Sequence, residues 1–266
     1  MRLNYLALTI LALGLIASKA EARTICTVVA DANTAKILVQ EGDCAGRVTP
    51  ASTFKIAISL MGFDSGFLKD DHTPTLPYRV GYPDWGGEPW RQPADPARWL
   101  QLSVVWFSQQ VTQSLGQDRF QRYTTAFDYG NTDVSGKPAY RNGMMGAWIN
   151  STLQISPLEQ IAFLAKVVNR QLPVSARALQ MTDRITEIAA LPSGWDIHGK
   201  TGTGSPGNNG KYDAAHAYGW FVGWATKGAD TLVFARLIQD ERPAEPNAGI
   251  RARDSLLKDF PALFPS

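Results

Sequence analysis

The chain has 266 residues, of which 44% are hydrophobic, and its formal net charge is +2. This length suits one large domain or two small ones, and the hydrophobic content is sufficient for a buried core. The basic residues form no run, so the surface has no electrostatic footprint for nucleic acid or for an anionic membrane. Recognition of a ligand must therefore depend on local groups.

The N-terminal stretch is typical of a secretory signal. Arg2 is followed by an apolar run over residues 5–16 and by Ala20-Glu21-Ala22, a pattern that predicts a signal peptide of residues 1–22. An uncleaved membrane anchor is the alternative, although the apolar run is short for a span of about 20 residues. After cleavage the chain would have a net charge of about +1. We expect it in the periplasm or outside the cell, with no membrane attachment.

The two cysteines, Cys26 and Cys44, flank a predicted hairpin. Its strands are the β-branched runs 27–30 and 36–39, and its turn is Asp31-Ala32-Asn33-Thr34. Export to an oxidising compartment would allow a disulfide between the two cysteines. A hairpin with this turn does not place them directly opposite each other, and disulfide geometry is demanding. Two separate thiols therefore stay open as the alternative.

A Ser-x-x-Lys tetrad, Ser52-Thr53-Phe54-Lys55, opens the next element, an apolar segment that predicts a helix ended by Gly62. Its spacing puts the hydroxyl and the amine on one helical face. Burial among apolar neighbours would keep the amine of Lys55 neutral, so that it could take the proton of Ser52. Alone the motif is weak. Ser255-Leu256-Leu257-Lys258 also matches it on an ordinary amphipathic helix, and a serine at a helix start often only caps the helix.

The middle of the chain is predicted to be helical. Residues 70–96 are rich in Pro, Gly and Trp and predict a long ordered loop that could lie over a site. Helical spacing follows, and one helix opens with the capping box Ser156-Pro157-Leu158-Glu159. The predicted helices span 100–115, 118–127, 156–169 and 176–190.

The C-terminal region changes from the period of a helix to that of a strand. Three strands and a final helix are predicted, at 195–203, 219–225, 231–239 and 249–260. Strands at both ends of the chain indicate an α/β domain whose sheet is assembled from the two termini, with an inserted helical subdomain. The predicted single catalytic domain is 23–266, with a sheet subdomain at about 23–50 and 193–266 and a helical subdomain at about 51–192.

Three further motifs follow the tetrad in order: Ser103-Val104-Val105, Tyr129-Gly130-Asn131 and Lys200-Thr201-Gly202. A Ser-x-x-Lys, a second serine and a Lys-Thr-Gly in this order are the signature of the serine β-lactamases and penicillin-binding proteins. With Ser-x-Val and Tyr-Gly-Asn also present, the chain resembles the class D β-lactamases, or oxacillinases, over roughly residues 24–260. The resemblance implies an antiparallel sheet flanked by helices, with the site in the cleft beside an all-helical half.

The resemblance also implies roles for the catalytic groups. Ser52 would be the nucleophile that forms an acyl-enzyme, aided by the amide and dipole of the helix start. In class D enzymes the lysine of the tetrad combines with carbon dioxide, in equilibrium with bicarbonate, and its carbamate is the general base. Lys55 would therefore carry this carbamate. The family places a tryptophan against it, and Trp148 matches by its place after Tyr129-Gly130-Asn131, although a plain core position is the alternative.

Ser103 would relay a proton to the leaving nitrogen. Penicillin-binding proteins and class A enzymes have a polar Asn at the third place of its motif. This chain has Val105 there. An isopropyl group would form part of an apolar wall and dry the pocket of the base, which suits a carbamate mechanism.

The Lys200-Thr201-Gly202 motif lies on a predicted strand, whose alternation directs Lys200 and Gly202 to one face. Gly202 would let a flat substrate approach the backbone, and the amide of Thr203 would be the second oxyanion donor. The resemblance implies that Lys200 and Thr201 hold the substrate carboxylate.

An arginine of the last helix often helps to hold this carboxylate in the family. Arg253 fits best, with Arg251 as its competitor. For each of them, solvated surface charge is the alternative interpretation.

Other chemistries find no support in the sequence. His72, His198 and His216 lie far apart and form no metal-ligand spacing, so no metal is expected. A Ser-His-Asp triad would need a Gly-x-Ser-x-Gly elbow, which the sequence lacks. Carbon dioxide or bicarbonate is therefore the one small molecule implied besides the substrate.

We therefore predict hydrolysis of the amide of penicillin-type antibiotics, with cephalosporins as further candidates. The alternative is a β-lactam sensor or penicillin-binding domain that is acylated without turnover, although such domains normally follow transmembrane helices. A transpeptidase is weakened by Val105. The sequence leaves open whether oxacillins, cephalosporins or carbapenems are preferred, and whether the protein is a monomer or a homodimer.

Overall fold

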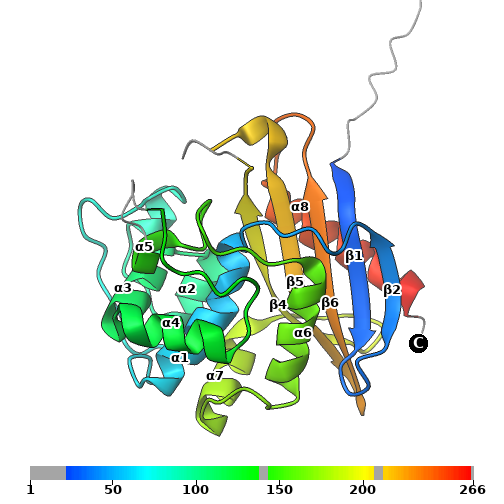
Figure 1. Ribbon diagram of the computed structural model, residues 1–266, viewed down its shortest axis with the longest axis horizontal. Helices are drawn as coiled ribbons and strands as arrows, with labels where there is room; N and C mark the ends of the chain where they lie inside the picture. Colours follow the sequence, from blue (N-terminus) through cyan, green and yellow to red (C-terminus); the bar gives the residue numbers. More distant parts are fainter. Residues whose placement is uncertain (1–21, 138–142, 207–211, 265–266) are drawn as a thin grey trace, which may run out of the picture.

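The computed structural model describes residues 22–137, 143–206 and 212–264 (Figure 1). The expected signal peptide therefore lies outside the described residues, apart from Ala22. Strand β1 begins at Arg23, the residue after the expected cleavage point. In the described ranges, no helix has both the length and the apolar character needed to cross a membrane.

One half of the molecule is a six-stranded antiparallel sheet with the order β2-β1-β6-β5-β4-β3. Its strands are β1 Arg23–Asp31, β2 Ile37–Gly42, β3 Glu187–Ala190, β4 Asp196–Gly204, β5 Tyr218–Lys227 and β6 Asp230–Gln239. The N-terminal strand β1 pairs with the C-terminal strand β6 in the middle of the sheet (Figure 1). This arrangement confirms the predicted sheet, in which both termini take part.

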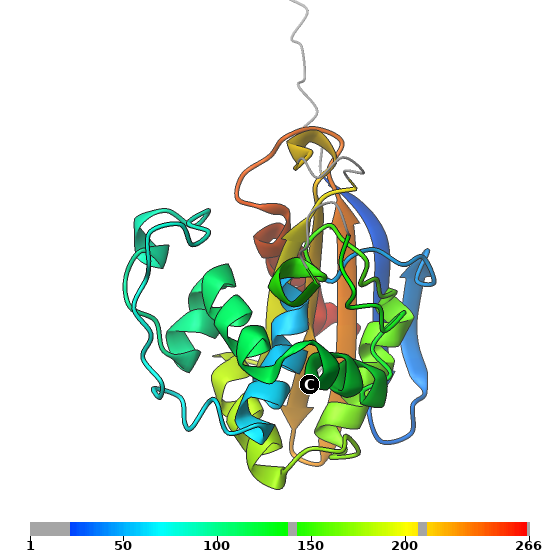
Figure 2. The same ribbon diagram turned by 60° about the vertical axis from the view of Figure 1, so that its left-hand side comes forward.

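The other half is helical and lies against one face of the sheet, whereas α8 covers the opposite face (Figures 1 and 2). The α-helices are α1 Lys55–Asp64, α2 Pro96–Leu102, α3 Val105–Leu115, α4 Gln117–Ala126, α5 Gly143–Gly146, α6 Pro157–Val168, α7 Ala176–Thr186 and α8 Ala248–Leu263. Short 3-10 helices are η1 Ala51–Phe54, η2 Glu88–Trp90 and η3 Ala214–His216.

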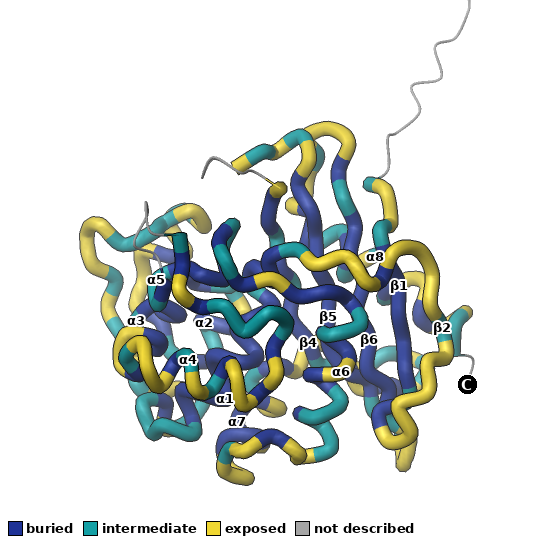
Figure 3. The backbone as a smooth tube through the Cα atoms, in the orientation of Figure 1, coloured by how far each residue is buried: buried dark blue, intermediate teal, exposed yellow. Residues whose placement is uncertain are grey.

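The two faces of the sheet bury two separate cores. On β5, Trp220, Val222 and Trp224 belong to the core shared with the helical half, whereas Phe221 and Ala225 belong to the core under α8. This is the two-residue alternation of a strand that is covered on both sides. The central strands are accordingly buried along most of their length (Figure 3). Packing on both faces therefore fixes the position of the sheet strands.

The predicted helix 100–115 is wrong, because two helices occupy this segment. The chain breaks at Ser103, whose φ of 60° is left-handed and ends α2. Val104 is extended, and α3 begins at Val105. Apolar residues continue across the break, so hydrophobic spacing alone did not reveal it. The break places Ser103 at the junction of two helices.

The predicted helix 176–190 is also too long. Helix α7 ends at Thr186, because Glu187 turns to an extended conformation. Residues 187–190 then form the edge strand β3, which pairs with β4. Pairing with a neighbouring strand therefore overrode the local helical pattern.

Gly62 does not end the first helix, as the sequence predicted, but lies inside α1. A Cβ atom there would come within 2.7 Å of Leu68 Cδ1 and 3.0 Å of Val111 Cγ1. The glycine is required by the close approach of neighbouring side chains, and α1 continues to Asp64.

The predicted loop of residues 70–96 is held against α3 by aromatic side chains. Trp90 donates from its indole nitrogen to the carbonyl of Leu102 at 2.9 Å, and Trp106 donates to the carbonyl of Trp90 at 2.8 Å. The ring of Tyr82 stacks on Trp106. The loop is therefore fastened next to Ser103, and part of it, η2, is helical.

Cys26 and Cys44 form a disulfide, with their Cα atoms 5.0 Å apart. Strand β1 pairs Cys26 with Gly42, so that Cys44 lies just beyond the paired residues. A register shift between Val29 and Ala30 accommodates the uneven arms of the hairpin. The disulfide fixes the chain where β2 leads towards η1.

Replacing both Cys26 and Cys44 by alanine is expected to lower the free energy of unfolding by about 3 kcal/mol, because the bridge closes a short loop in the unfolded chain. The bridged residues are 18 positions apart. Denaturant unfolding of the double variant under non-reducing conditions measures the change. A reduced wild-type protein should show the same loss, and equal stability of oxidised and reduced protein would contradict the expectation.

Candidate active site

The tetrad lies where the chain passes from the sheet to the helical half. The residue before it, Ala51, has a left-handed φ of 50°, and its amide donates to the carbonyl of Trp148 at 3.0 Å. Ser52 then lies in η1, and Lys55 begins α1. The Nζ atom of Lys55 donates to Oγ of Ser52 at 2.8 Å. The structure thus brings the predicted nucleophile and the predicted base into direct contact.

Lys55 has no solvent-exposed surface. The aromatic ring of its neighbour Phe54 packs against Tyr129 and Trp148. Burial lowers the pKa of Lys55 well below its usual value, and the positive charge of Lys200 lowers it further. Both effects favour the neutral form of the amine, which is the form that can accept a proton or react as a nucleophile.

Strand β4 passes directly beside the tetrad. At Gly202, a Cβ atom would lie 2.9 Å from the carbonyl oxygen of Pro50 and 3.2 Å from the amide nitrogen of Ser52. Only a glycine leaves room for this approach without displacing the helix start. The start of η1, which carries the predicted nucleophile Ser52, and the strand with Lys200, Thr201 and Gly202 therefore pack closely together.

Lys200 is 5% exposed, and its Nζ atom donates to the carbonyl oxygen of Thr201 at 3.0 Å. Burial, with a smaller effect of the positive charge of Arg253, lowers the pKa of Lys200 to about 7. Both lysines are buried beside the same cavity, and the charge of Lys200 lowers the pKa of Lys55. An anion bound there would favour the charged form of Lys200.

A cavity of about 920 Å³ opens over Ser52. Predicted site residues in its wall are Ser52, Ser103, Val105, Thr201, Gly202, Thr203 and Arg253. Lys55, Lys200 and Trp148 are buried residues that are not part of this wall. The site is therefore an open cleft for a ligand. The amines of Lys55 and Lys200 are buried behind the wall of this cleft.

Trp148 is completely buried, and its ring also contacts Phe120 edge to face. Its carbonyl holds the amide of Ala51, as described above. Among the described residues, its indole nitrogen has no hydrogen-bond partner. A buried donor of this kind normally has an acceptor. An added group with an oxygen acceptor would therefore fit next to this nitrogen.

The two candidate arginines of α8 are separated clearly. Arg253 reaches the cavity wall, and its guanidinium also meets the carboxylate of Asp254 at 2.8 Å. Arg251 is bonded elsewhere, to Asp240 at 2.5 Å and to the carbonyl of Pro246 at 2.7 Å. The structure therefore places Arg253, and not its competitor, in the cavity.

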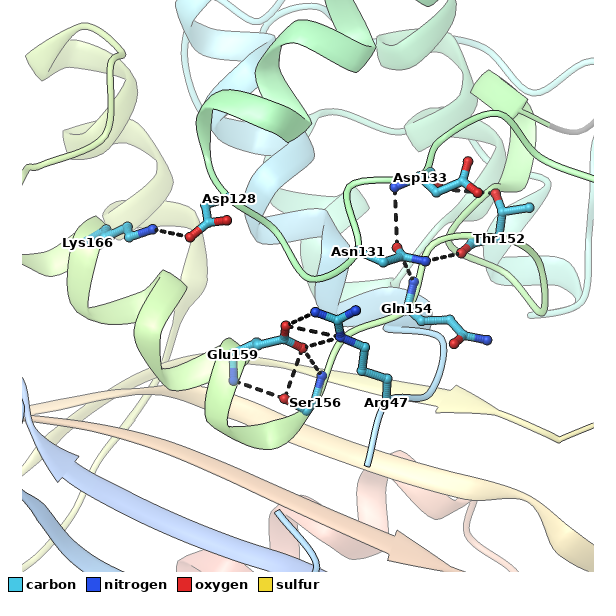
Figure 4. Close-up of polar contacts among 9 residues, drawn as sticks. All are labelled: Arg47, Asp128, Asn131, Asp133, Thr152, Gln154, Ser156, Glu159 and Lys166. Atoms are coloured by element: carbon cyan, nitrogen blue, oxygen red, sulfur yellow. Dashed lines mark hydrogen bonds and ion pairs between the residues drawn. The ribbon is translucent and has the colours of Figure 1, made fainter. Parts of the chain in front are cut away.

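The Tyr129-Gly130-Asn131 motif is not part of the cavity wall. The side chain of Asn131 donates to the carbonyl of Thr152 at 2.8 Å and accepts from the amide of Gln154 at 2.9 Å (Figure 4). A Cβ atom at Gly130 would lie 2.1 Å from the carbonyl of Gln154. The motif therefore clamps the segment that follows Trp148.

The helix after this clamp is fixed by the predicted capping box. Ser156 and Glu159 bond reciprocally at the start of α6, and the carboxylate of Glu159 also pairs with Arg47 (Figure 4). Lys166 on the same helix meets Asp128 at 3.1 Å. These contacts tie α6 to the segments at both of its sides.

Several cavity residues were not identified from the sequence. They include Trp85, Trp90, Asn150, Tyr212 and Asn247. The sequence does indicate a structural role for Asn247, because asparagine is a favourable N-cap residue before the last helix. The predicted start of that helix was nevertheless Gly249. For the two tryptophans, the sequence provided only the general expectation that the loop of residues 70–96 could cover a site.

The three histidines are apart in the fold as in the sequence. His72 bonds to Asp95 at 2.9 Å, His198 stacks on Trp224, and His216 bonds to Asp213 at 2.7 Å. Within the described ranges, no group of three or more His, Cys, Asp or Glu residues is arranged to hold a metal ion.

Comparison with known proteins agrees with this geometry. Residues 25–262 match the family model of the penicillin-binding protein transpeptidase domain. β-Lactamase OXA-9 of Klebsiella pneumoniae is 42% identical over 90% of this chain and 88% of its own length. β-Lactamase OXA-1 of Escherichia coli is 35% identical over 87% of this chain and 82% of its own length.

A solved structure extends the agreement from sequence to fold. The crystal structure of the class D β-lactamase OXA-427 superposes with a TM-score of 0.83 at 45% identity, covering 89% of this chain and 97% of that one. The chain therefore belongs to the penicillin-binding protein transpeptidase-domain family and, within it, to the class D serine β-lactamases.

Proposed function

We propose that this β-lactamase is exported and opens penicillin-type lactams with Ser52 as nucleophile and a carbamylated Lys55 as general base. The observation that carries the proposal is the 2.8 Å contact between Nζ of Lys55 and Oγ of Ser52, made by an amine with no exposed surface. A neutral amine is the form that adds to carbon dioxide, and burial favours that form.

Two residues beside the Ser52–Lys55 tetrad suit a carbamate: Trp148, whose ring packs on Phe54, and Val105, which lines the cavity with Ser52. Trp148 offers a buried indole N–H that has no partner among the described residues, which suits an added anionic oxygen. Val105, 4% exposed, contributes an apolar side chain to the wall and helps to exclude water. When present, the carbamate would supply an oxygen base beside Ser52.

Acylation then uses groups of this chain. The hydroxyl of Ser52 gives its proton to the base at Lys55, and Oγ bonds to the lactam carbonyl carbon. The carbon–nitrogen bond then breaks, and the ring nitrogen receives a proton through Ser103. We assign the oxyanion to the backbone amides of Ser52 and Thr203, which the close approach of Gly202 supports. Water later cleaves the ester on Ser52 and regenerates its hydroxyl.

The carboxylate of the substrate is assigned to Lys200, Thr201 and Arg253. Thr201 and Arg253 line the cavity, and Lys200 lies close enough to Arg253 for the arginine to lower its pKa. An anion would relieve this repulsion between like charges. The positive charges at this end of the cavity would therefore favour binding of a negative group next to the scissile bond.

Export is supported by three features. The N-terminal sequence is typical of a signal peptide. The sheet begins at Arg23, directly after the predicted cleavage point. The two cysteines form a disulfide, and disulfides are common in exported proteins.

The pH dependence of kcat/KM is expected to be bell-shaped. The rising limb reports loss of a proton from Lys55, whose pKa is lowered by burial. The falling limb reports loss of the positive charge of Lys200, whose pKa is about 7, as the pH rises through that value. Because the charge of Arg253 helps to lower this pKa, Arg253→Gln should move the falling limb to higher pH. A falling limb that does not move would contradict the coupling of these two groups.

Steady-state hydrolysis of a chromogenic cephalosporin and of benzylpenicillin tests the function as a whole. We expect many turnovers per enzyme molecule, with acylation of Ser52 detected by mass spectrometry on rapid quenching. A single stoichiometric burst without turnover would instead indicate a sensor or penicillin-binding domain. Cleavage of the signal peptide is tested by sequencing the N-terminus of the secreted protein, which should begin at Arg23.

A further inference from the structure

We propose that the ion pair between Asp240 and Arg251 is a positioning device for substrate binding. It would fix the N-terminus of α8 against strand β4 and thereby orient Arg253 and Asn247 at the cavity. The proposal rests on the role assigned above to Arg253 in holding the substrate carboxylate.

The ion pair is buried and specific. Asp240 directly follows β6 and is 3% exposed, and its amide donates to the carbonyl of Ala217 at 2.7 Å. Its Oδ2 atom accepts from Nη2 of Arg251 at 2.5 Å. Its Oδ1 atom is buried and has no partner among the described residues. The guanidinium of Arg251 is therefore what compensates the charge of this carboxylate.

Arg251 also closes the connection between β6 and α8. While one nitrogen of its guanidinium holds Asp240, at the start of this connection, Nε donates to the carbonyl of Pro246 at 2.7 Å, near its end. One side chain therefore spans residues 240–246 and determines where the next residue, Asn247, lies. A planar guanidinium is suited to this because its donors have fixed directions.

The end of this connection is in contact with the strand of the Lys-Thr-Gly motif. Asn247 caps α8 and accepts from the hydroxyl of Thr203 at 2.9 Å. The amide of Gly249 donates to the same hydroxyl at 3.0 Å. A Cβ atom at Gly249 would lie 2.6 Å from the carbonyl of Gly202. A shift of the helix start would therefore be transmitted to the backbone assigned to the oxyanion.

Helical geometry connects the ion pair to Arg253. Side chains two positions apart on an α-helix point about 200° apart. Arg251 faces Asp240, and Arg253 consequently faces the cavity. Holding Arg251 fixes the rotation of this first turn of α8, and with it the direction of Arg253.

The chain contains a matched control for a merely structural role. Arg236 on β6 meets Asp259 at 2.7 Å, and Asp259 lies on α8 about two turns beyond Arg251. This pair also joins β6 to α8, but neither residue lines the cavity. Its loss should loosen the helix without rotating the turn that carries Arg253.

The test compares Asp240→Asn with Asp259→Asn by thermal unfolding and by steady-state kinetics on a chromogenic cephalosporin that carries the ring carboxylate. We expect Asp240→Asn to raise KM about tenfold, with a smaller change in kcat, because binding geometry is lost before chemistry. Asp259→Asn should lower Tm and leave KM unchanged. If Asp240→Asn alters Tm alone, or if both variants raise KM equally, the positioning role is wrong.

Arg253→Gln distinguishes this proposal from the function on which it rests. We expect Arg253→Gln to raise KM, and Asp240→Asn to add little when combined with it, because both changes act on one contact. If Arg253→Gln alone leaves KM unchanged, the assigned carboxylate role fails. If Arg253→Gln raises KM and Asp240→Asn does not, the carboxylate role stands and the positioning role fails. Should Asp240→Asn not fold, Arg251→Lys provides the same comparison, since it keeps the charge but loses the fixed fork of donors.

Discussion

Lys55→Ala is expected to lower kcat/KM by about 10²- to 10⁴-fold, the range for removal of a positioned general base. Lys55 lies 2.8 Å from Oγ of Ser52 and has no exposed surface. Water could fill the space left by the amine, but it is a much weaker base. The loss should appear in both acylation and deacylation, because the same group is proposed to serve both steps.

The chain supplies its own control for this variant. Lys258 belongs to the second Ser-x-x-Lys match, Ser255-Leu256-Leu257-Lys258, and is exposed on α8. Lys258→Ala should retain wild-type kinetics. Circular dichroism and Tm would verify that Lys55→Ala is folded. Near-full activity of a folded Lys55→Ala protein would remove Lys55 from the mechanism.

Gly202→Ala is expected to lower kcat/KM by about 10²-fold, since a displacement of roughly 1 Å at a reacting group can have that effect. The added methyl group would lie 2.9 Å from the carbonyl of Pro50 and 3.2 Å from the amide of Ser52. Both neighbours are backbone atoms, so the helix start or strand β4 must move. Stopped-flow measurement of acylation should show the loss in this step first.

Gly62→Ala is the matched control, because it adds the same methyl group at a similarly tight place. Its Cβ atom would lie 2.7 Å from a side-chain carbon of Leu68, within the core of the helical half. We expect a lower Tm with kcat/KM unchanged per folded molecule. Equal kinetic losses in the two variants would indicate general destabilisation and contradict the specific role of Gly202.

The sequence predicted those parts of the site that depend on short spacings. The interval between Ser52 and Lys55 and the alternation along the Lys200 strand each act within one element, so local geometry is sufficient. The same holds for the capping box at Ser156, which the structure contains as predicted. The two-ended sheet also followed from the order of strand and helix patterns.

The sequence failed where distant segments determine the local conformation. Gly62 lies inside α1 where the side chain of Val111, from α3, approaches too closely for a larger residue. Residues 187–190 form a strand because β4 offers an edge to pair with. The break at Ser103 interrupts a continuous apolar pattern. Helical spacing of apolar residues does not reveal any of these three features.

The choice between Arg251 and Arg253 has the same origin. Spacing cannot decide which of them faces the cavity, because the answer depends on the rotation of α8. The carboxylate of Asp240, at the end of β6, engages Arg251 and leaves Arg253 for the cavity. Asn247 and Trp85 likewise reach the cavity through tertiary packing of loops.

The central claim, that a dry niche converts Lys55 into the general base, is tested most directly by ¹³C NMR of the enzyme in ¹³C-bicarbonate. We predict a carbamate resonance that is absent from Lys55→Ala, together with hydrolysis that falls when carbon dioxide is removed and recovers when bicarbonate is restored. Absence of the resonance from an enzyme that keeps full turnover without carbon dioxide would contradict the claim.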